Sequence, residues 1–418
     1  DFTTNLIKRY LLRYTQKFAR EHLKKSQRTV RRVDRVASLQ LEVQASDEKH
    51  NEALRNFEKA HEGRLSVLGS DHRDTLESTF AIGMVTSRIG PTREARQAID
   101  IFRKVLESRR RVFGDHDPAT ITSMHHLGKL LTSQGDLDEA RLLLEKVLEI
   151  RRSELPADHR QLIGSMTSMA NVLIYLEQKD LVEQNLDEAQ ALLGEALESC
   201  RRAFIKEHPT TLTVLKSMGR LCTARDQHAE AEPHYKEALA GFRRIQGNNS
   251  RSTMRMINDL GVLLLKQGYL VEAKLLLEEC LEGRKGVMPD DHIQIAMSFS
   301  NLGWVHRELG DLEKAEFCGK EATRRGEDRD QVAIAFVNWK YSLTLVALNR
   351  FADAEVHAKK AWGRFETWKH FSAEKKIEYI EGLVVLYDAW HKAEPDAGHD
   401  QSATRWRAKL EEAAAAAT

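Results

Sequence analysis

Apolar residues recur along most of the chain at the spacing of helix faces, and the helices that they predict come in pairs. Between residues 121 and 150, one apolar face runs from Ile121 to Leu131 and, after a break at Gly135, a second runs from Leu137 to Ile150. Apolar residues three and four apart line one face of an α-helix, and a glycine beside a polar residue ends a helix. The pattern therefore predicts an antiparallel pair of helices.

The predicted pair repeats along the chain. A small residue follows Met, Leu or Ile in each first helix: Gly83, Gly128, Ala170, Gly219, Gly261 and Gly303, at steps of 45, 42, 49, 42 and 42 residues. An alanine recurs in each second helix and keeps step with it: Ala95, Ala140, Ala189, Ala231, Ala273 and Ala315. One helix pair cannot bury both of its apolar faces alone, so the period predicts a tandem array of stacked pairs.

The connectors between pairs carry a second regularity. Residues 114–120 read Gly-Asp-His-Asp-Pro-Ala-Thr, and related versions stand at 69–75, 158–159, 207–211 and 290–292. With the small residue, the turn glycine and the alanine, this connector resembles the tetratricopeptide repeat, in the 42-residue form of kinesin light chains. The resemblance covers about residues 50–366. It implies an all-α fold, a right-handed superhelical solenoid of antiparallel helix pairs, in which each first helix lines a concave groove.

We expect three parts: a basic N-terminal helical segment or cap at residues 1–50, an array of seven or eight repeats at 51–366, and C-terminal capping helices at 367–418. Residues 1–35 hold eleven Lys or Arg interleaved with apolar residues at helical spacing. Such a helix caps or joins a domain in one interpretation, and contacts an anionic partner or a membrane surface in the other. Because the chain begins at Asp1, we also expect it to be a fragment or a processed form.

Composition narrows the classes of function. Lys and Arg number 64 against 63 Asp and Glu, which leaves a net charge of +1, so the strong basicity of a typical nucleic-acid binder is absent. No apolar run reaches the ~20 residues that span a bilayer. The four cysteines are spaced without a Cys-x-x-Cys motif. We therefore expect free thiols in a reducing compartment, the cytoplasm, and no nucleic-acid partner.

The sequence lacks the common motifs of catalytic and cofactor-binding sites. The chain has no phosphate-binding loop, dinucleotide-binding fingerprint, nucleophile elbow or zinc-protease motif,. Histidines recur once in most connectors, at His72, His116, His159, His208 and His292. Stacked repeats place such residues ~10 Å apart, whereas zinc ligands meet within about 2.1 Å of the ion. We expect these histidines to cap helices or bridge loops, and we expect no metal, cofactor or catalytic residue.

Basic pairs end the second helices, at 109–111, 151–152, 201–202, 243–244, 284–285 and 324–325. Cations near a helix C-terminus complement its dipole by about 0.3–1 kcal/mol each, and they can pair with acids of the connectors. The other interpretation is a basic ridge along one edge of the array that an acidic partner uses.

The family geometry implies which side chains face the groove. Together with the aromatic residues near the C-terminal end, the predicted partner-binding residues are Lys129, Asn171, Lys216, Arg220, Arg255, Asn258, Lys266, Trp304, Arg307, Phe336 and Trp339. Basic residues outnumber acidic ones, and a surface of one sign attracts the opposite charge. All six tryptophans lie beyond residue 303. They form either a packing layer of the cap or, at Trp304 and Trp339, an aromatic pocket of the groove.

The sequence thus favours a non-catalytic scaffold that binds an acidic peptide or protein segment. The asparagines with which peptide-binding relatives hold the ligand backbone are largely missing here, apart from Asn258 and Asn301 with Asn171 nearby, which speaks against kinesin-type cargo recognition. Two alternatives remain open. The array could be the sensor of a larger nucleotide-binding signalling receptor, or its groove could bind a small molecule or act as an enzyme.

Overall fold

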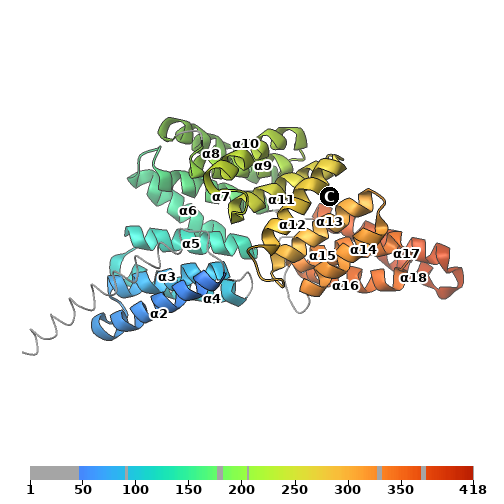
Figure 1. The fold of residues 1–418 in the computed structure, drawn as a ribbon, viewed down its shortest axis with the longest axis horizontal. Helices are drawn as coiled ribbons and strands as arrows, with labels where there is room; N and C mark the ends of the chain where they lie inside the picture. Colours follow the sequence, from blue (N-terminus) through green and yellow to red (C-terminus); the bar gives the residue numbers. More distant parts are fainter. Residues whose placement is uncertain are drawn as a thin grey trace, which may run out of the picture. The chain divides into compact units, whose positions relative to one another are not determined.

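The computed structural model describes residues 47–89, 93–176, 182–204, 207–326, 332–368 and 373–417, and the basic segment predicted at the N-terminus lies almost wholly outside these ranges. Regular structure within them is helical throughout, without a strand (Figure 1). The chain divides into two compact units, residues 1–130 and 131–418, and we describe each by itself. The all-α fold predicted from the sequence is confirmed, whereas the three-part division of the chain stays a prediction.

The first unit contains α2 (Asp47–Leu68), α3 (Arg73–Ile89), α4 (Arg93–Phe113) and most of α5 (Pro118–Gln134). The second contains α6 (Leu137–Glu154), α7 (Arg160–Tyr175), α8 (Val182–Ala203), α9 (Pro209–Ala224), α10 (His228–Gln246), α11 (Arg251–Lys266), α12 (Leu270–Lys285), α13 (Ile293–Glu308), α14 (Leu312–Gly326), α15 (Val332–Ala347), α16 (Phe351–Thr367), α17 (Ala373–Ala393), the 3₁₀ turn η1 (Pro395–Ala397) and α18 (His399–Ala417). In the first unit α2 packs on α3 and α3 on α4, and in the second each α-helix from α6 to α17 packs on the next.

The repeated small residue marks the place where the two helices of a pair approach most closely. A Cβ atom added at Gly219 would lie 2.5 Å from the ring of Tyr235, and one at Gly261 would lie 2.9 Å from the side chain of Leu277. The recurrent alanine of the second helix is fully buried at each repeat of the second unit, at Ala140, Ala189, Ala231, Ala273 and Ala315. Larger side chains at these positions would force the pair apart, which explains the period seen in the sequence.

The connectors begin the first helices with caps. In four of them, a histidine accepts at Nδ1 a hydrogen bond of 3.1–3.3 Å from the backbone N–H two residues later; these are His72, His159, His208 and His292. Asp117 does the same for Ala119, at 2.9 Å. A side-chain acceptor at this position satisfies a backbone donor that the helix leaves without a partner. The structural role expected for these four histidines is confirmed.

Three of the basic pairs contain a buried arginine that ties one helix pair to the next. Each guanidinium donates from Nη1 to a carbonyl ten residues later and to a serine hydroxyl fourteen residues later, at 2.6–3.1 Å. We call these contacts arginine–serine joints, and they are Arg109–Ser123, Arg151–Ser165 and Arg284–Ser298. These three arginines hold the stack together and cannot belong to a basic ridge, because each is at least 95% buried.

Two intervening joints lack both partners. The equivalent positions hold Cys200 with Val214 between α8 and α9, and Phe242 with Met256 between α10 and α11, all of them buried. The arginine and the serine are therefore replaced together by apolar residues. This substitution is physically consistent, because a buried serine or guanidinium without its partner would leave unsatisfied hydrogen-bonding groups in the interior.

The arginine–serine joint predicts a large difference between two neighbouring arginines. Arg151→Ala removes a buried cation and leaves Ser165 and the carbonyl of Gln161 without their partner, so we expect the free energy of unfolding to fall by roughly 2–3 kcal/mol. Arg152→Ala removes only an exposed ion pair with Glu195, and we expect a loss below about 1 kcal/mol. Urea unfolding followed by circular dichroism measures both. Equal losses would contradict the structural role of Arg151.

The histidine caps predict that stability depends on pH. Burial, and to a lesser degree Arg160, lowers the pKa of His208, so the cap contributes fully above the ordinary value of about 6.5 and is lost as pH falls through the folded-state pKa. His208→Ser keeps an acceptor that does not titrate. Between pH 7.5 and pH 5, we expect the wild type to lose about 1 kcal/mol relative to this variant in urea unfolding. A difference that does not change with pH would refute the prediction.

Candidate functional site

First helices of consecutive pairs lie next to one another in the second unit. α7 contacts α9, α11 contacts α13, and α13 contacts α15. Polar side chains bridge them: Asn171 Nδ2 donates to Ser217 Oγ at 3.0 Å, and Asn301 Nδ2 donates to Asn258 Oδ1 at 3.1 Å. We call the surface of these helices the A-helix wall and define it by Asn171, Ser217, Arg220, Arg255, Asn258, Asp259, Lys266, Asn301, Trp304, Arg307 and Lys340.

Arg220 and Arg255 lie around the single acidic residue of the wall, Asp259. Arg220 Nη2 lies 3.4 Å from Asp259 Oδ2. Burial acts to lower the pKa of Arg220, but the Asp259 carboxylate outweighs it and the pKa is raised. Arg255 reaches solvent, yet burial by the surrounding protein, and then the charge of Arg220, lower its pKa. Asp259 therefore compensates Arg220 first and leaves Arg255 in excess.

The predicted lysines of the site are distributed over both units. Lys266 is exposed at the end of α11, and Lys216 is half-buried on α9. Lys129 is exposed on the part of α5 that belongs to the first unit, so it is not counted in the wall. In the described part of the chain, neither Lys266 nor Arg255 forms a hydrogen bond or ion pair. Both cations are therefore available to a ligand.

Lys340 is the most unusual cation of the wall. Its Nζ donates to Asn301 Oδ1 at 2.8 Å and lies 4.6 Å from the ring centre of Trp304. Burial, followed by the charges of Arg307 and Lys266, lowers the pKa of Lys340 to about 7. Loss of solvent around an ammonium and the proximity of other cations both favour its neutral form.

Two residues of α13, Trp304 and Arg307, flank Lys340 of α15. Arg307 Nη2 lies 2.6 Å from Glu308 Oε1, and Trp304 Nε1 donates to the same oxygen at 3.1 Å. Glu308 thus holds both side chains in place at the edge of the wall. The structure brings together Trp304, Arg307 and Lys266 of the predicted site, joined by Lys340.

Phe336 and Trp339 are placed differently from expectation. The sequence left two interpretations of the tryptophans, a packing layer of the cap and an aromatic pocket of the groove, and the structure packs Phe336 and Trp339 beneath α17. Trp339 is 8% exposed and its ring centre lies 4.5 Å from that of Tyr379, while Phe336 lies 5.0 Å from Phe365. A Cβ atom added at Gly382 would lie 2.5 Å from the indole of Trp339. These two residues belong to the core of the C-terminal helices, and any direct part in partner binding stays a prediction.

Sequence reasoning missed Lys340 because the last repeats are shorter. α15 begins at Val332, 39 residues after α13 begins at Ile293, so a 42-residue step does not find the matching position. A different signal was available. Lys340 is the sole charged residue of α15, whose other residues are mostly apolar, and a lone charge in such a segment calls for a specific reason.

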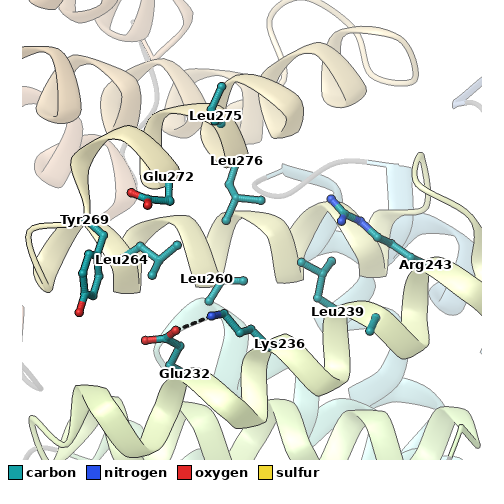
Figure 2. A pocket seen from close by; sticks show the side chains of 11 residues that line it. Glu232, Lys236, Leu239, Arg243, Leu260, Leu264, Tyr269, Glu272, Leu275 and Leu276 are labelled. Atoms are coloured by element: carbon teal, nitrogen blue, oxygen red, sulfur yellow. Dashed lines mark ion pairs between the residues drawn. The ribbon is translucent and has the colours of Figure 1, made fainter.

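A depression in the surface lies on another face of α11. It is a groove of about 620 Å³ between α10, α11 and α12, with Leu239, Leu260, Leu264 and Leu276 as its apolar lining (Figure 2). The Glu232–Lys236 ion pair, 2.6 Å long, lies along one side. Leu275, at the rim, is 61% exposed. The groove is therefore an apolar depression separate from the A-helix wall.

Exposed apolar residues also recur along the second helices. Leu275 is the second residue after the repeated Ala273, and apolar residues occupy the same position in the other pairs of this unit: Leu142, Ala191, Pro233, Phe317 and Val356, all exposed. The sequence contains this regularity in register with the repeated alanine. It forms a row distinct from the charged residues of the A-helix wall.

Two searches of the described residues were negative. No group of three or more His, Cys, Asp or Glu side chains there could hold a metal ion. Within the same ranges, every helix is too short or too polar to pass through a lipid bilayer.

A comparison with known protein families locates the repeats along the chain. The sequence model described as tetratricopeptide repeat matches residues 94–153, 181–244, 222–286 and 252–328. The matched segments cover α4 to α14 apart from the region around α7. The 42-residue subtype inferred from the connectors stays a prediction.

Individual proteins are similar over different lengths. The mouse (Mus musculus) mitochondrial tetratricopeptide repeat protein 19 is 26% identical over 167 residues, which span 38% of this chain and 40% of the mouse protein. The structure of a Rap protein complexed with competence and sporulation factor has a TM-score of 0.62 at 11% identity, over 93% of this chain and 99% of that one. NprR in complex with its cognate peptide NprX has a TM-score of 0.51 at 14% identity, over 75% and 84%. At these identities, the likeness concerns the fold.

The different burial of Trp339 and Trp304 predicts that replacing each with alanine lowers the free energy of unfolding by different amounts. Trp339→Ala leaves a cavity between α15 and α17, and we expect a loss of about 3–5 kcal/mol in the free energy of unfolding. Trp304→Ala removes a half-buried ring and its cation–π contact, so we expect a loss below about 2 kcal/mol. Urea unfolding compares the two variants directly. If Trp304→Ala proved the more costly, the burial assigned to Trp339 would be wrong.

Proposed function

Residues 94–153 and 181–328 belong to the tetratricopeptide repeat family, and on that premise we propose that the A-helix wall binds an acidic peptide or an acidic segment of a partner protein. The repeat fold is typical of modules for protein interaction. Among structures of similar fold, NprR was solved in complex with its cognate peptide NprX. For the present chain, the peptide is our inference from its own wall residues.

One observation carries the proposal: the charge of the wall is positive and incompletely compensated. Arg220, Arg255, Lys266, Arg307 and Lys340 come from four successive first helices, α9, α11, α13 and α15. Asp259 is paired with Arg220, and Glu308 with Arg307. None of the remaining three cations forms an ion pair with an acid among the described residues. A row of this kind attracts an anionic segment and speeds its capture.

The polar bridges favour a peptide backbone as part of the ligand. Asn258 and Asn301 stand side by side between Arg255 and Lys340, and an amide side chain offers both donors and acceptors,. An extended segment laid across the first helices would present its carbonyl and N–H groups to these amides, while its acidic side chains meet the cations. We propose that the array acts without catalysis and that its four buried, unbridged cysteines suit a reducing compartment.

Selection from a random peptide library displayed on phage tests this function. We expect the wild-type chain to select peptides rich in Asp and Glu, whose affinity falls as salt rises from 50 to 300 mM. Arg255→Glu combined with Lys266→Glu should weaken these peptides by at least about tenfold.

The control carries the same change of charge elsewhere. Lys236→Glu combined with Lys320→Glu reverses two exposed lysines on the second helices α10 and α14 and should leave the affinity within about twofold. Selected peptides without acidic enrichment, or equal losses in both double variants, would refute the proposal.

A further inference from the structure

The environment of Lys340 lacks an anion. Its ammonium group has one hydrogen-bond acceptor among the described residues, the neutral amide of Asn301, and one aromatic contact, the ring of Trp304. The amide nitrogen of Asn301 donates onward to Asn258, which is also neutral. Enclosed charges in proteins are normally paired with an opposite charge. The first sphere around Lys340 supplies only neutral partners.

The charged groups that act on Lys340 from the helices around it are cations. Arg307 approaches from α13 and Lys266 from α11, while α15 itself has no other charged residue. The nearest acid on α13, Glu308, is engaged by Arg307 and by the indole nitrogen of Trp304. Three cations therefore converge on one place and share no carboxylate.

This arrangement lowers the affinity of Lys340 for its proton. Burial, Arg307 and Lys266 lower its pKa to about 7, so near neutral pH about half of the molecules carry an uncharged amine. An anion placed between the three cations would oppose this shift, because an opposite charge within ~4–6 Å favours the charged form.

We propose that an acidic side chain of the ligand docks against Lys340, Asn301 and Trp304, and that Lys340 takes up a proton when the ligand binds. This inference rests on the proposed function and adds a regulation to it: the A-helix wall captures its ligand more strongly in a more acidic medium. The cations Arg255 and Lys266 attract the ligand at any physiological pH, whereas Lys340 makes the capture depend on protons.

The direction of the effect follows from linkage. Below about pH 6 nearly every Lys340 is already charged, and the affinity is independent of pH. Above pH 7 the ligand must pull a proton onto Lys340, so the affinity falls by up to about tenfold per pH unit until the pH reaches the pKa of the bound state. At pH 7, binding takes up about half a proton.

Fluorescence anisotropy with a fluorescein-labelled decaglutamate peptide tests the proposal from pH 6 to pH 9 at constant ionic strength. We expect the wild type to lose at least about tenfold in affinity over this range. Lys340→Arg, which remains charged throughout, should keep the affinity of pH 6 at every pH. Lys340→Met, which keeps the stem without the charge, should bind weakly with no pH dependence. A wild-type affinity that does not change with pH, or a Lys340→Met variant that changes as the wild type does, overturns the proposal.

The outcomes separate this inference from the proposed function. If the wild type and Lys340→Met bind decaglutamate equally while Arg255→Glu with Lys266→Glu binds it weakly, the proton linkage fails and the proposed function stands. If no variant binds decaglutamate, both fail.

An NMR titration of the free chain tests the proton affinity of Lys340 independently of peptide binding. In NMR spectra of the wild-type chain with ¹³C-labelled lysine, one Cε resonance, assigned by its absence in Lys340→Met, should titrate near pH 7 and move upward with the peptide. Titration of that resonance near the ordinary value of about 10.4 in the free chain overturns the proposal.

Discussion

No helix pair of this chain can bury its own apolar faces, so each pair depends on close contact with the next. That contact requires small residues where the two helices of a pair meet, since a side chain at Gly219 would collide with the ring of Tyr235. It also requires a fully buried alanine in each second helix. The repeat period, the turns and the order of the helices all follow from this one packing requirement.

The buried arginines of the arginine–serine joints stand where a serine hydroxyl and a backbone carbonyl face them. The guanidinium of Arg284 reaches both the serine and the carbonyl that face it, whereas at neighbouring joints the arginine and the serine are both replaced by apolar residues. The A-helix wall follows a different rule. There, Asp259 compensates one arginine and Glu308 another, and Lys340 is left with neutral partners. The buried arginines of the joints have hydrogen-bond partners on the next helix, so the cations of the wall that form no ion pair are the natural place for a ligand.

The sequence predicted much of the fold, because helix faces, small residues and turn glycines are local signals that repeat. It predicted the histidine caps for the same reason. It predicted less of the site. Arg109, Arg151 and Arg284 were not separable from their exposed neighbours, since only the packed joint decides which member of a basic pair is buried. The choice between a packing layer and a pocket stayed open for Trp339, because the return of α17 over α15 is a long-range contact that periodicity does not contain. Lys340 was missed because α15 begins 39 residues after α13, and not 42.

The two joints without arginine and serine lie on either side of α9 and α10, next to Arg220 and before Arg255. Directional hydrogen bonds hold both the distance and the angle between two helix pairs, while apolar contact holds the distance and leaves small rotations nearly equal in energy. At these two joints, the directional contacts lie on the first helices instead, in the hydrogen bonds of Asn171 with Ser217 and of Arg220 with Asp259. The wall residues that a ligand would meet are therefore among those that hold these two joints together.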